Sequence, residues 1–186
     1  MATVNLLPNA DVVNYPAWTL STGSDVYALL NDDDTGNPTS DGSQITATAA
    51  GKKCIVQFDD FDDTDVDSIE SVQGIIKANV YERGRTYQIG MAIRNPFGVI
   101  WNEELTSSTS SSASWVTFSF TAQTTRHQTF GGAWNNIALD NIRMEIHANA
   151  LSGGTLRVTY AYFIVNYTPT AAAVAADNST FFGANF

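Results

Sequence analysis

Apolar and polar residues alternate along much of the chain. Three segments show this most clearly: TYQIGMAI (residues 86–93), WVTFSFTA (115–122) and IRMEIHANA (142–150). A period of two places successive side chains on opposite faces, which is typical of a strand with one packed face and one wet face. The pattern therefore predicts three half-buried antiparallel strands.

The alternation also assigns each side chain in these strands to a face. Glu145, His147 and Trp115 belong to the outward set, where we expect them to be solvated. The inward set consists of Tyr87, Ile89, Met91, Ile93, Val116, Phe118, Phe120, Ile142, Met144, Ile146 and Ala148.

Weaker patterns add further strands. The longest apolar segment, residues 156–167, is bulky on both faces, which favours a central strand. Gly153 and Gly154 precede it and supply the positive φ values of a hairpin turn back to residues 142–150. The other expected strands are 26–30, 43–49, 53–58 and 71–81, the last with Val72, Ile76, Ala78 and Val80 inward.

Helical patterns are nearly absent, with one short turn expected within residues 134–142. About eight strands separated by polar turns, without strand–helix alternation, predict an all-β fold. We expect an antiparallel, jelly-roll-like β-sandwich over residues 1–168, with an extended C-terminal arm over 169–186. Residues 31–42 and 106–114 are rich in turn-forming or small polar residues and are expected to be loops.

The net charge of the chain makes some kinds of binding partner unfavourable. Nineteen Asp and Glu oppose nine Lys and Arg, for a net charge of −10. This charge disfavours nucleic acid and anionic membranes as partners. A single cysteine, Cys54, excludes an internal disulfide, and its strand position predicts a buried thiol. The N-terminus lacks a secretory pattern, so we expect synthesis and assembly in a host cytoplasm.

No combination of residues predicts catalysis. His127 and His147 have no motif-placed nucleophile or acid, and both are expected to be solvated. Glu103 and Glu104 suggest the paired carboxylates of a glycosidase, but neighbours in a strand point to opposite faces. We therefore predict no enzymatic activity, no catalytic residues and no cofactor.

Calcium binding and sugar binding are two further possibilities that the sequence raises. The acidic stretches 32–41 and 59–67 offer oxygen ligands for calcium, although neither matches an EF-hand and a solvated loop is the simpler interpretation. We therefore predict no metal site. Four tryptophans, Trp18, Trp101, Trp115 and Trp134, could stack on sugars, or pack in the core or at its rim.

Three segments resemble structural proteins of marine tailed phages and cyanophages. They are NLLPNADVVNYPAWTLSTGSDVYALLNDDD (5–34), CIVQFDDFDDTDVDSIESVQGIIKANV (54–80) and GGTLRVTYAYFIVNYT (153–168). The resemblance implies a virion protein without defined catalytic residues. A capsid decoration protein that binds the outer shell as a homo-oligomer is expected first. A tail or fibre module that binds a host glycan or receptor is the alternative, and a jelly-roll glycosidase is a third.

The C-terminal arm supplies the predicted partner site. Pro169 removes a strand donor, and the Ala-rich run after it cannot form a core of its own. Phe181, Phe182 and Phe186 are then expected to enter apolar pockets on the major capsid protein, another virion protein or a second copy. A disordered tail, or one folded back onto its own sandwich, is the alternative.

Overall fold

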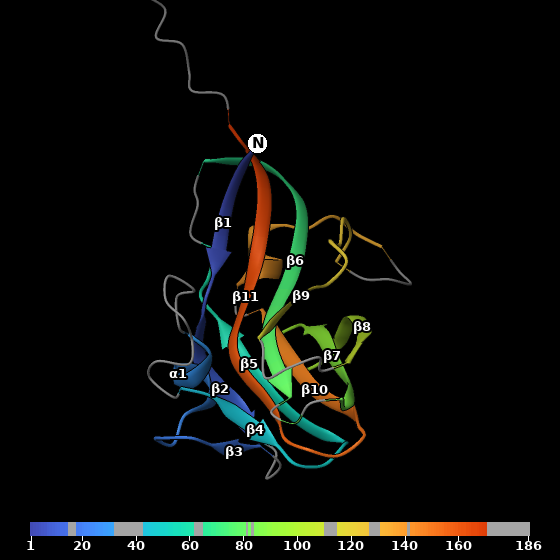
Figure 1. Ribbon diagram of the computed structural model, residues 1–186. Helices are drawn as coiled ribbons and strands as arrows, with labels where there is room; N and C mark the ends of the chain where they lie inside the picture. The colour runs from blue at the N-terminus through green and yellow to red at the C-terminus, as the bar shows by residue number, and fades with distance from the viewer. Residues whose placement is uncertain are drawn as a thin grey trace, which may run out of the picture.

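β-Strands are the dominant secondary structure in the described part of the chain, as a computed structural model shows (Figure 1). The structure describes residues 1–14, 18–31, 43–61, 65–80, 82, 84–109, 115–126, 131–140 and 142–170. The strands are β1 (Ala2–Leu6), β2 (Pro8–Asn14), β3 (Thr19–Leu20), β4 (Ile45–Ala47), β5 (Lys52–Phe58), β6 (Val66–Val80), β7 (Thr86–Arg94), β8 (Ile100–Thr109), β9 (Val116–Ser119), β10 (Arg143–Leu151) and β11 (Leu156–Pro169). Two short helices, α1 (Val26–Leu30) and α2 (Asn136–Leu139), interrupt them.

The strands form two antiparallel sheets. The first has the order β3-β4-β11-β6-β9, with β1 also paired to β11, and the second has the order β2-β5-β10-β7-β8. The long strands β6 and β11 run side by side through the first sheet, and the N-terminus lies near the end of β11 (Figure 1). The predicted all-β antiparallel sandwich is thus confirmed, and β11 is central as expected.

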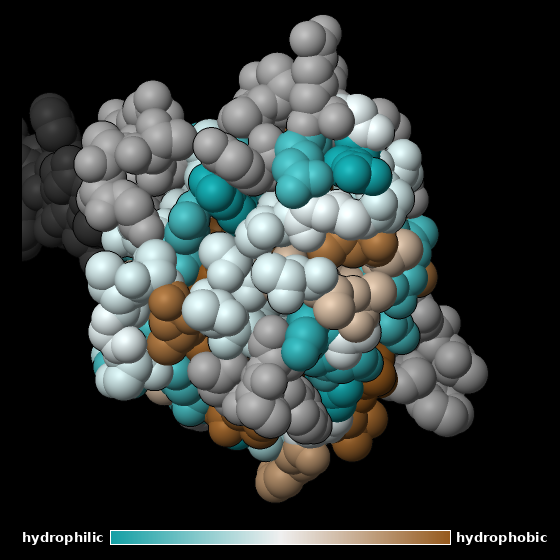
Figure 2. All heavy atoms as spheres, turned by 60° about the horizontal axis from the view of Figure 1, so that its bottom comes forward, coloured by the Kyte–Doolittle hydropathy of each residue, from teal (hydrophilic) through white to brown (hydrophobic). Residues whose placement is uncertain are grey.

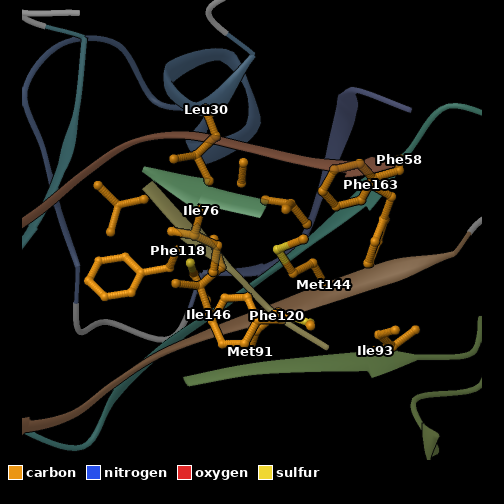
Figure 3. Packing of buried hydrophobic residues seen from close by; sticks show 14 of the residues in the cluster. Leu30, Phe58, Ile76, Met91, Ile93, Phe118, Phe120, Met144, Ile146 and Phe163 are labelled. Carbon is orange, nitrogen blue, oxygen red and sulfur yellow. The ribbon is translucent and has the colours of Figure 1, made fainter. Parts of the chain in front are cut away.

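The core lies between the two sheets and contains side chains from both (Figure 3). Phe58 of β5 and Phe163 of β11 meet there with ring centroids 4.7 Å apart. Cys54 is buried in the same layer, and burial raises the pKa of its thiol, as expected for an inert core cysteine. One continuous apolar core therefore joins the sheets.

Most inward assignments of the sequence are confirmed. The predicted inward residues of β6, β7 and β10 are all buried, as are Phe118 and Phe120. Val116 is the exception: it is 37% exposed, because it begins β9 at the edge of the first sheet. In β6, β7 and β10, which each pair with a strand on both sides, the alternation predicted correctly which side chains face the core.

The predicted strand at residues 26–30 is wrong, because this segment is the helix α1. Its buried residues Val26, Leu29 and Leu30 follow helical rather than alternating spacing. The carboxylate of Asp11 on β2 accepts hydrogen bonds from the backbone N–H groups of Val26 (2.8 Å) and Tyr27 (2.7 Å). A side chain from a distant strand thus satisfies the donors at the start of α1.

The predicted hairpin between residues 142–150 and 156–167 is also wrong. Gly153 and Gly154 do have positive φ values, 110° and 81°. However, β10 belongs to the second sheet and β11 to the first, so the turn carries the chain from one sheet to the other. The short helical turn predicted within residues 134–142 is confirmed as α2.

The surface has a mixed polarity. On the face drawn in Figure 2, apolar side chains lie in separate patches between polar ones. None of the helices in the described ranges is long and apolar enough to cross a membrane.

Candidate functional site

The turn between β7 and β8 presents a phenylalanine to solvent. The N–H of Gly98 donates to the carbonyl of Asn95 (2.9 Å), and the N–H of Asn95 donates to the carbonyl of Val99 (3.0 Å). The Asn95 side chain also accepts from the N–H of Val99 (2.8 Å). Pro96 presets the turn, and Gly98 takes a φ of +83° that other residues rarely adopt. Phe97 stands at the tip and is 91% exposed.

Helix α2 presents a second apolar side chain. Asn135 caps it by accepting a hydrogen bond from the N–H of Ala138 (2.8 Å). Ala138 and Leu139 anchor the helix in the core, while Ile137 points outward and is 81% exposed. A capped and anchored turn therefore holds Ile137 at the surface.

Two tryptophans lie beneath these exposed groups. Trp134 is buried, and its indole N–H donates to the carbonyl of Gln123 (2.8 Å). Trp101, at the start of β8, is half-buried and packs edge-on against Trp134, with centroids 5.6 Å apart and an interplanar angle of 78°. The contact fixes the orientation of Trp101.

Polar groups complete the site. The backbone of Arg126 is held by Gly132, whose carbonyl accepts from its N–H at 3.0 Å, and by the side-chain amide of Asn102 at 3.4 Å. Asp140 follows α2, and its N–H donates to the carbonyl of Asn136 (2.9 Å). Arg126 is exposed, with no carboxylate of the described residues within salt-bridge distance.

These elements enclose a groove of about 550 Å³, which we call the aromatic groove. It is lined by Asn95, Pro96, Phe97, Trp101, Arg126, Asn135, Ile137, Ala138 and Asp140. Phe97, Trp101 and Ile137 offer apolar contact, and the polar members offer hydrogen-bond donors and acceptors. Apolar walls with a few polar groups are typical of ligand sites, and the volume is within their usual range.

The face of the second sheet away from the core contains a charge cluster, formed by Lys53, Arg94, Glu103, Glu145 and His147, in which only Glu145 and His147 are buried. Glu145 lies at its centre and is 1% exposed. It contacts Lys53 (2.9 Å), the Nε2 of His147 (2.5 Å) and Arg94. The prediction that Glu145 and His147 are solvated is wrong, because neighbouring side chains cover this face.

Ion pairing outweighs burial at Glu145. Burial alone would raise the pKa of its carboxyl, but hydrogen bonds from His147 and Lys53, together with the charges of His147 and Arg94, lower it to about 2. His147 is 3% exposed, and its Nδ1 lies 3.5 Å from Glu103. The cluster therefore holds an ionised carboxylate among cations.

The two adjacent glutamates do not pair. Glu103 extends toward His147 outside the second sheet, whereas Glu104 accepts a hydrogen bond from the N–H of Thr121 (2.7 Å). Their opposite directions agree with the expectation from strand geometry. Among the described residues, no three His, Cys, Asp or Glu side chains come together as metal ligands.

Several predicted sites fall outside the described residues. These are the acidic stretch 32–41, residues 62–64 of the second acidic stretch, His127 and the arm residues Phe181, Phe182 and Phe186. Of the four tryptophans, Trp18 and Trp134 are buried, while Trp101 and Trp115 are half-buried. Trp101 alone lines the aromatic groove.

Sequence reasoning missed Phe97, Arg126 and Ile137. A signal for Phe97 was present: the sequence NPFG (residues 95–98) is a turn motif with an aromatic residue at its tip. Nothing in the sequence distinguishes Ile137 from the buried Ala138 and Leu139 that follow it. Nothing in the sequence places Arg126 beside them, because it comes from a separate loop.

Neither a family model nor a curated protein matches the chain. Among solved structures, it is similar to "CBM32 of AlyQ in complex with 4,5-unsaturated mannuronic acid" (14% identity, 83% of this chain, 98% of that chain, TM-score 0.44). It is also similar to "xylan-binding module CBM15" (13%, 91%, 100%, TM-score 0.39) and to "CBM4 structure and function" (13%, 75%, 92%, TM-score 0.33). At these values the likeness is limited to the β-sandwich architecture.

Proposed function

We propose that the protein is a non-catalytic carbohydrate-binding module and that the aromatic groove is its ligand site. The observation that carries this proposal is the exposure of Phe97 and Ile137 in one groove with Arg126, Asn135 and Asp140. Fully burying an apolar side chain of this size contributes roughly 1.5–3 kcal/mol, so both groups are available to bind a ligand.

The mixture of groups favours a sugar over a purely apolar ligand. A sugar ring has an apolar C–H face that packs on an aromatic ring, and hydroxyl groups around its edge that need hydrogen-bond partners. Phe97 and Trp101 supply rings. Asn135 and Arg126 supply donors, and Asp140 supplies acceptors. A purely apolar ligand would displace water from the polar rim of the groove and offer no hydrogen bonds in return.

The carboxylates support binding without hydrolysis. A glycosidase needs one carboxyl that carries a proton near neutral pH and a second one across the bond. Glu145 has a pKa of about 2 and is buried among cations, so it is a poor proton donor. Glu103 and Glu104 point in opposite directions.

We further propose a place for this module in a phage particle, on the sequence resemblance alone. Of the two virion roles, the groove supports the tail or fibre module that binds a glycan. Capsid decoration through residues 169–186 is the other role. Copy number per particle separates them: a count that matches the capsomers indicates the shell, and a much smaller count indicates the tail.

Affinity gel electrophoresis tests the binding proposal. The protein is run through gels that contain xylan, galactomannan or alginate, beside gels without polysaccharide. We expect at least one polysaccharide to slow the wild type, and Phe97→Ala to weaken that affinity by about tenfold, the effect of roughly 1.4 kcal/mol. Val116→Ala is the matched control, because Val116 is an exposed apolar residue outside the groove.

Three results would contradict the proposal. One is an unchanged mobility of the wild type in these gels and in a wider set of glycans. Another is equal retardation of the wild type and Phe97→Ala. Loss of retardation in Val116→Ala as strong as in Phe97→Ala would place the site elsewhere.

A further inference from the structure

One arginine connects the charge cluster to the aromatic groove. Arg94 is the last residue of β7, immediately before the turn that carries Phe97. Its Nη1 donates to the carbonyl of Gly98 in that turn, and its Nη2 contacts the carboxylate of Glu145. The two terminal nitrogens of one guanidinium therefore join the turn to Glu145, the third residue of β10.

Glu145, the carboxylate that Arg94 contacts, is itself held in place by other residues. Glu145 is held from two other sides, by Lys53 of β5 and by His147 two residues further along β10. It is almost fully buried, so water does not compete for its oxygens. A buried carboxylate held from these two sides is a rigid anchor for Arg94.

Small residues leave room for this arrangement. Ala92 lies directly opposite Glu145 in the register between β7 and β10. A Cβ on Gly90 would lie 2.5 Å from a methyl group of Leu105 and 3.3 Å from the Cβ of His147. Leu105 and His147 therefore pack against the bare backbone of β7, and a larger residue at position 90 would displace them.

We propose that Arg94 is a positioning residue for the aromatic groove, which holds the turn carrying Phe97 in place through its contact with Glu145. The turn has its own hydrogen bonds within residues 95–99, but these fix its shape and not its tilt relative to the sheet. The Arg94 guanidinium fixes the tilt of the turn relative to the sheet, because this planar group donates to Gly98 and to Glu145 at the same time. The consequence for ligand affinity rests on the proposed function, whereas the ordering of the turn does not.

Amide hydrogen exchange measures the ordering without any ligand. We expect Arg94→Met to speed exchange at Gly98 and Val99 by about tenfold more than at the amides of β5 and β10, which report any loss of global stability. Lys53→Met is the matched control: it removes another cation from Glu145 but touches no residue of the turn, so exchange at Gly98 and Val99 should rise no more than at the amides of β5 and β10. Arg94→Lys keeps a positive charge for Glu145 and loses the second donor, so it should loosen the turn as well.

Arg94→Lys also covers the case in which Arg94→Met fails to fold. Unchanged exchange at Gly98 and Val99 in a folded Arg94 variant, or equal acceleration in Lys53→Met, would overturn the proposal. Affinity for the polysaccharide that slows the wild type gives the second readout, with a loss of about fivefold expected for Arg94→Lys and none for Lys53→Met. If the wild type binds no polysaccharide, the proposed function fails while the exchange result still decides the role of Arg94.

Discussion

Replacing Glu145 by glutamine should destabilise the protein far more than its outward-facing strand position suggests. The substitution keeps the size of the side chain but leaves Lys53, Arg94 and His147 grouped around a neutral amide. Removing one partner of a buried ion pair costs about 3–5 kcal/mol. The pKa leads to a similar value: the fall from an ordinary 4.5 to about 2, at about 1.36 kcal/mol per pKa unit, corresponds to roughly 3 kcal/mol.

The pKa also predicts how stability depends on pH. A carboxyl whose pKa is lower in the folded protein binds protons more tightly when unfolded, so its contribution is complete above pH 4.5. The contribution of Glu145 is lost as the pH falls from about 4.5 to about 2. We therefore expect the wild type to lose stability in this range and Glu145→Gln to lose about 3 kcal/mol less.

Urea unfolding at pH 7 and at several acidic values measures both effects. Glu82→Gln is the control, because Glu82 is 51% exposed and pairs with Arg85 at 3.4 Å on the surface. Loss of a surface ion pair should lower the free energy of unfolding by at most about 0.5 kcal/mol. Equal losses for Glu145→Gln and Glu82→Gln at pH 7 would refute the reasoning. So would an identical acid dependence in the wild type and Glu145→Gln.

Two further predictions concern the core and α1. Ile146→Ala should lower the free energy of urea unfolding by about 2–5 kcal/mol, because Ile146 is fully buried between the sheets. Ile137→Ala, at an exposed position, should lower it by no more than about 0.5 kcal/mol. Similar losses in the two variants would mean that Ile146 is not in the core. Asp11→Ala should cost about 1–3 kcal/mol, because two N–H groups of α1 lose their acceptor, and Asp11→Asn should cost less, since one acceptor oxygen remains. Equal costs for the two Asp11 variants would contradict the role assigned to the carboxylate.

The sequence predicted correctly which strand side chains face the core, but it did not predict whether the opposite face is covered by other side chains. Period-two alternation is a local property, so Met91, Ile93 and Met144 could be assigned to the core from their neighbours alone. The same rule placed Glu145 and His147 on the other face correctly. It could not show that this face is covered there, because Lys53, Arg94 and Leu105 come from three other strands.

Elements that depend on distant residues were missed for the same reason. Helix α1 has only five residues and is too short to be stable alone. Its first donors are satisfied by Asp11, fifteen residues before Val26. The aromatic groove likewise combines a hairpin turn, α2 and the loop at Arg126, and only the tertiary fold brings these three segments together.

Chemical-shift mapping shows whether a sugar binds in the aromatic groove. A uniformly ¹⁵N-labelled sample is titrated with short oligosaccharides of the polysaccharide that slows the wild type in the gel. We expect the amides of Phe97, Gly98, Trp101 and Arg126, with the indole N–H of Trp101, to shift in proportion to occupancy, while those of β1 stay fixed. Shifts confined to residues outside the aromatic groove would contradict it, as would a spectrum that does not change at saturating oligosaccharide.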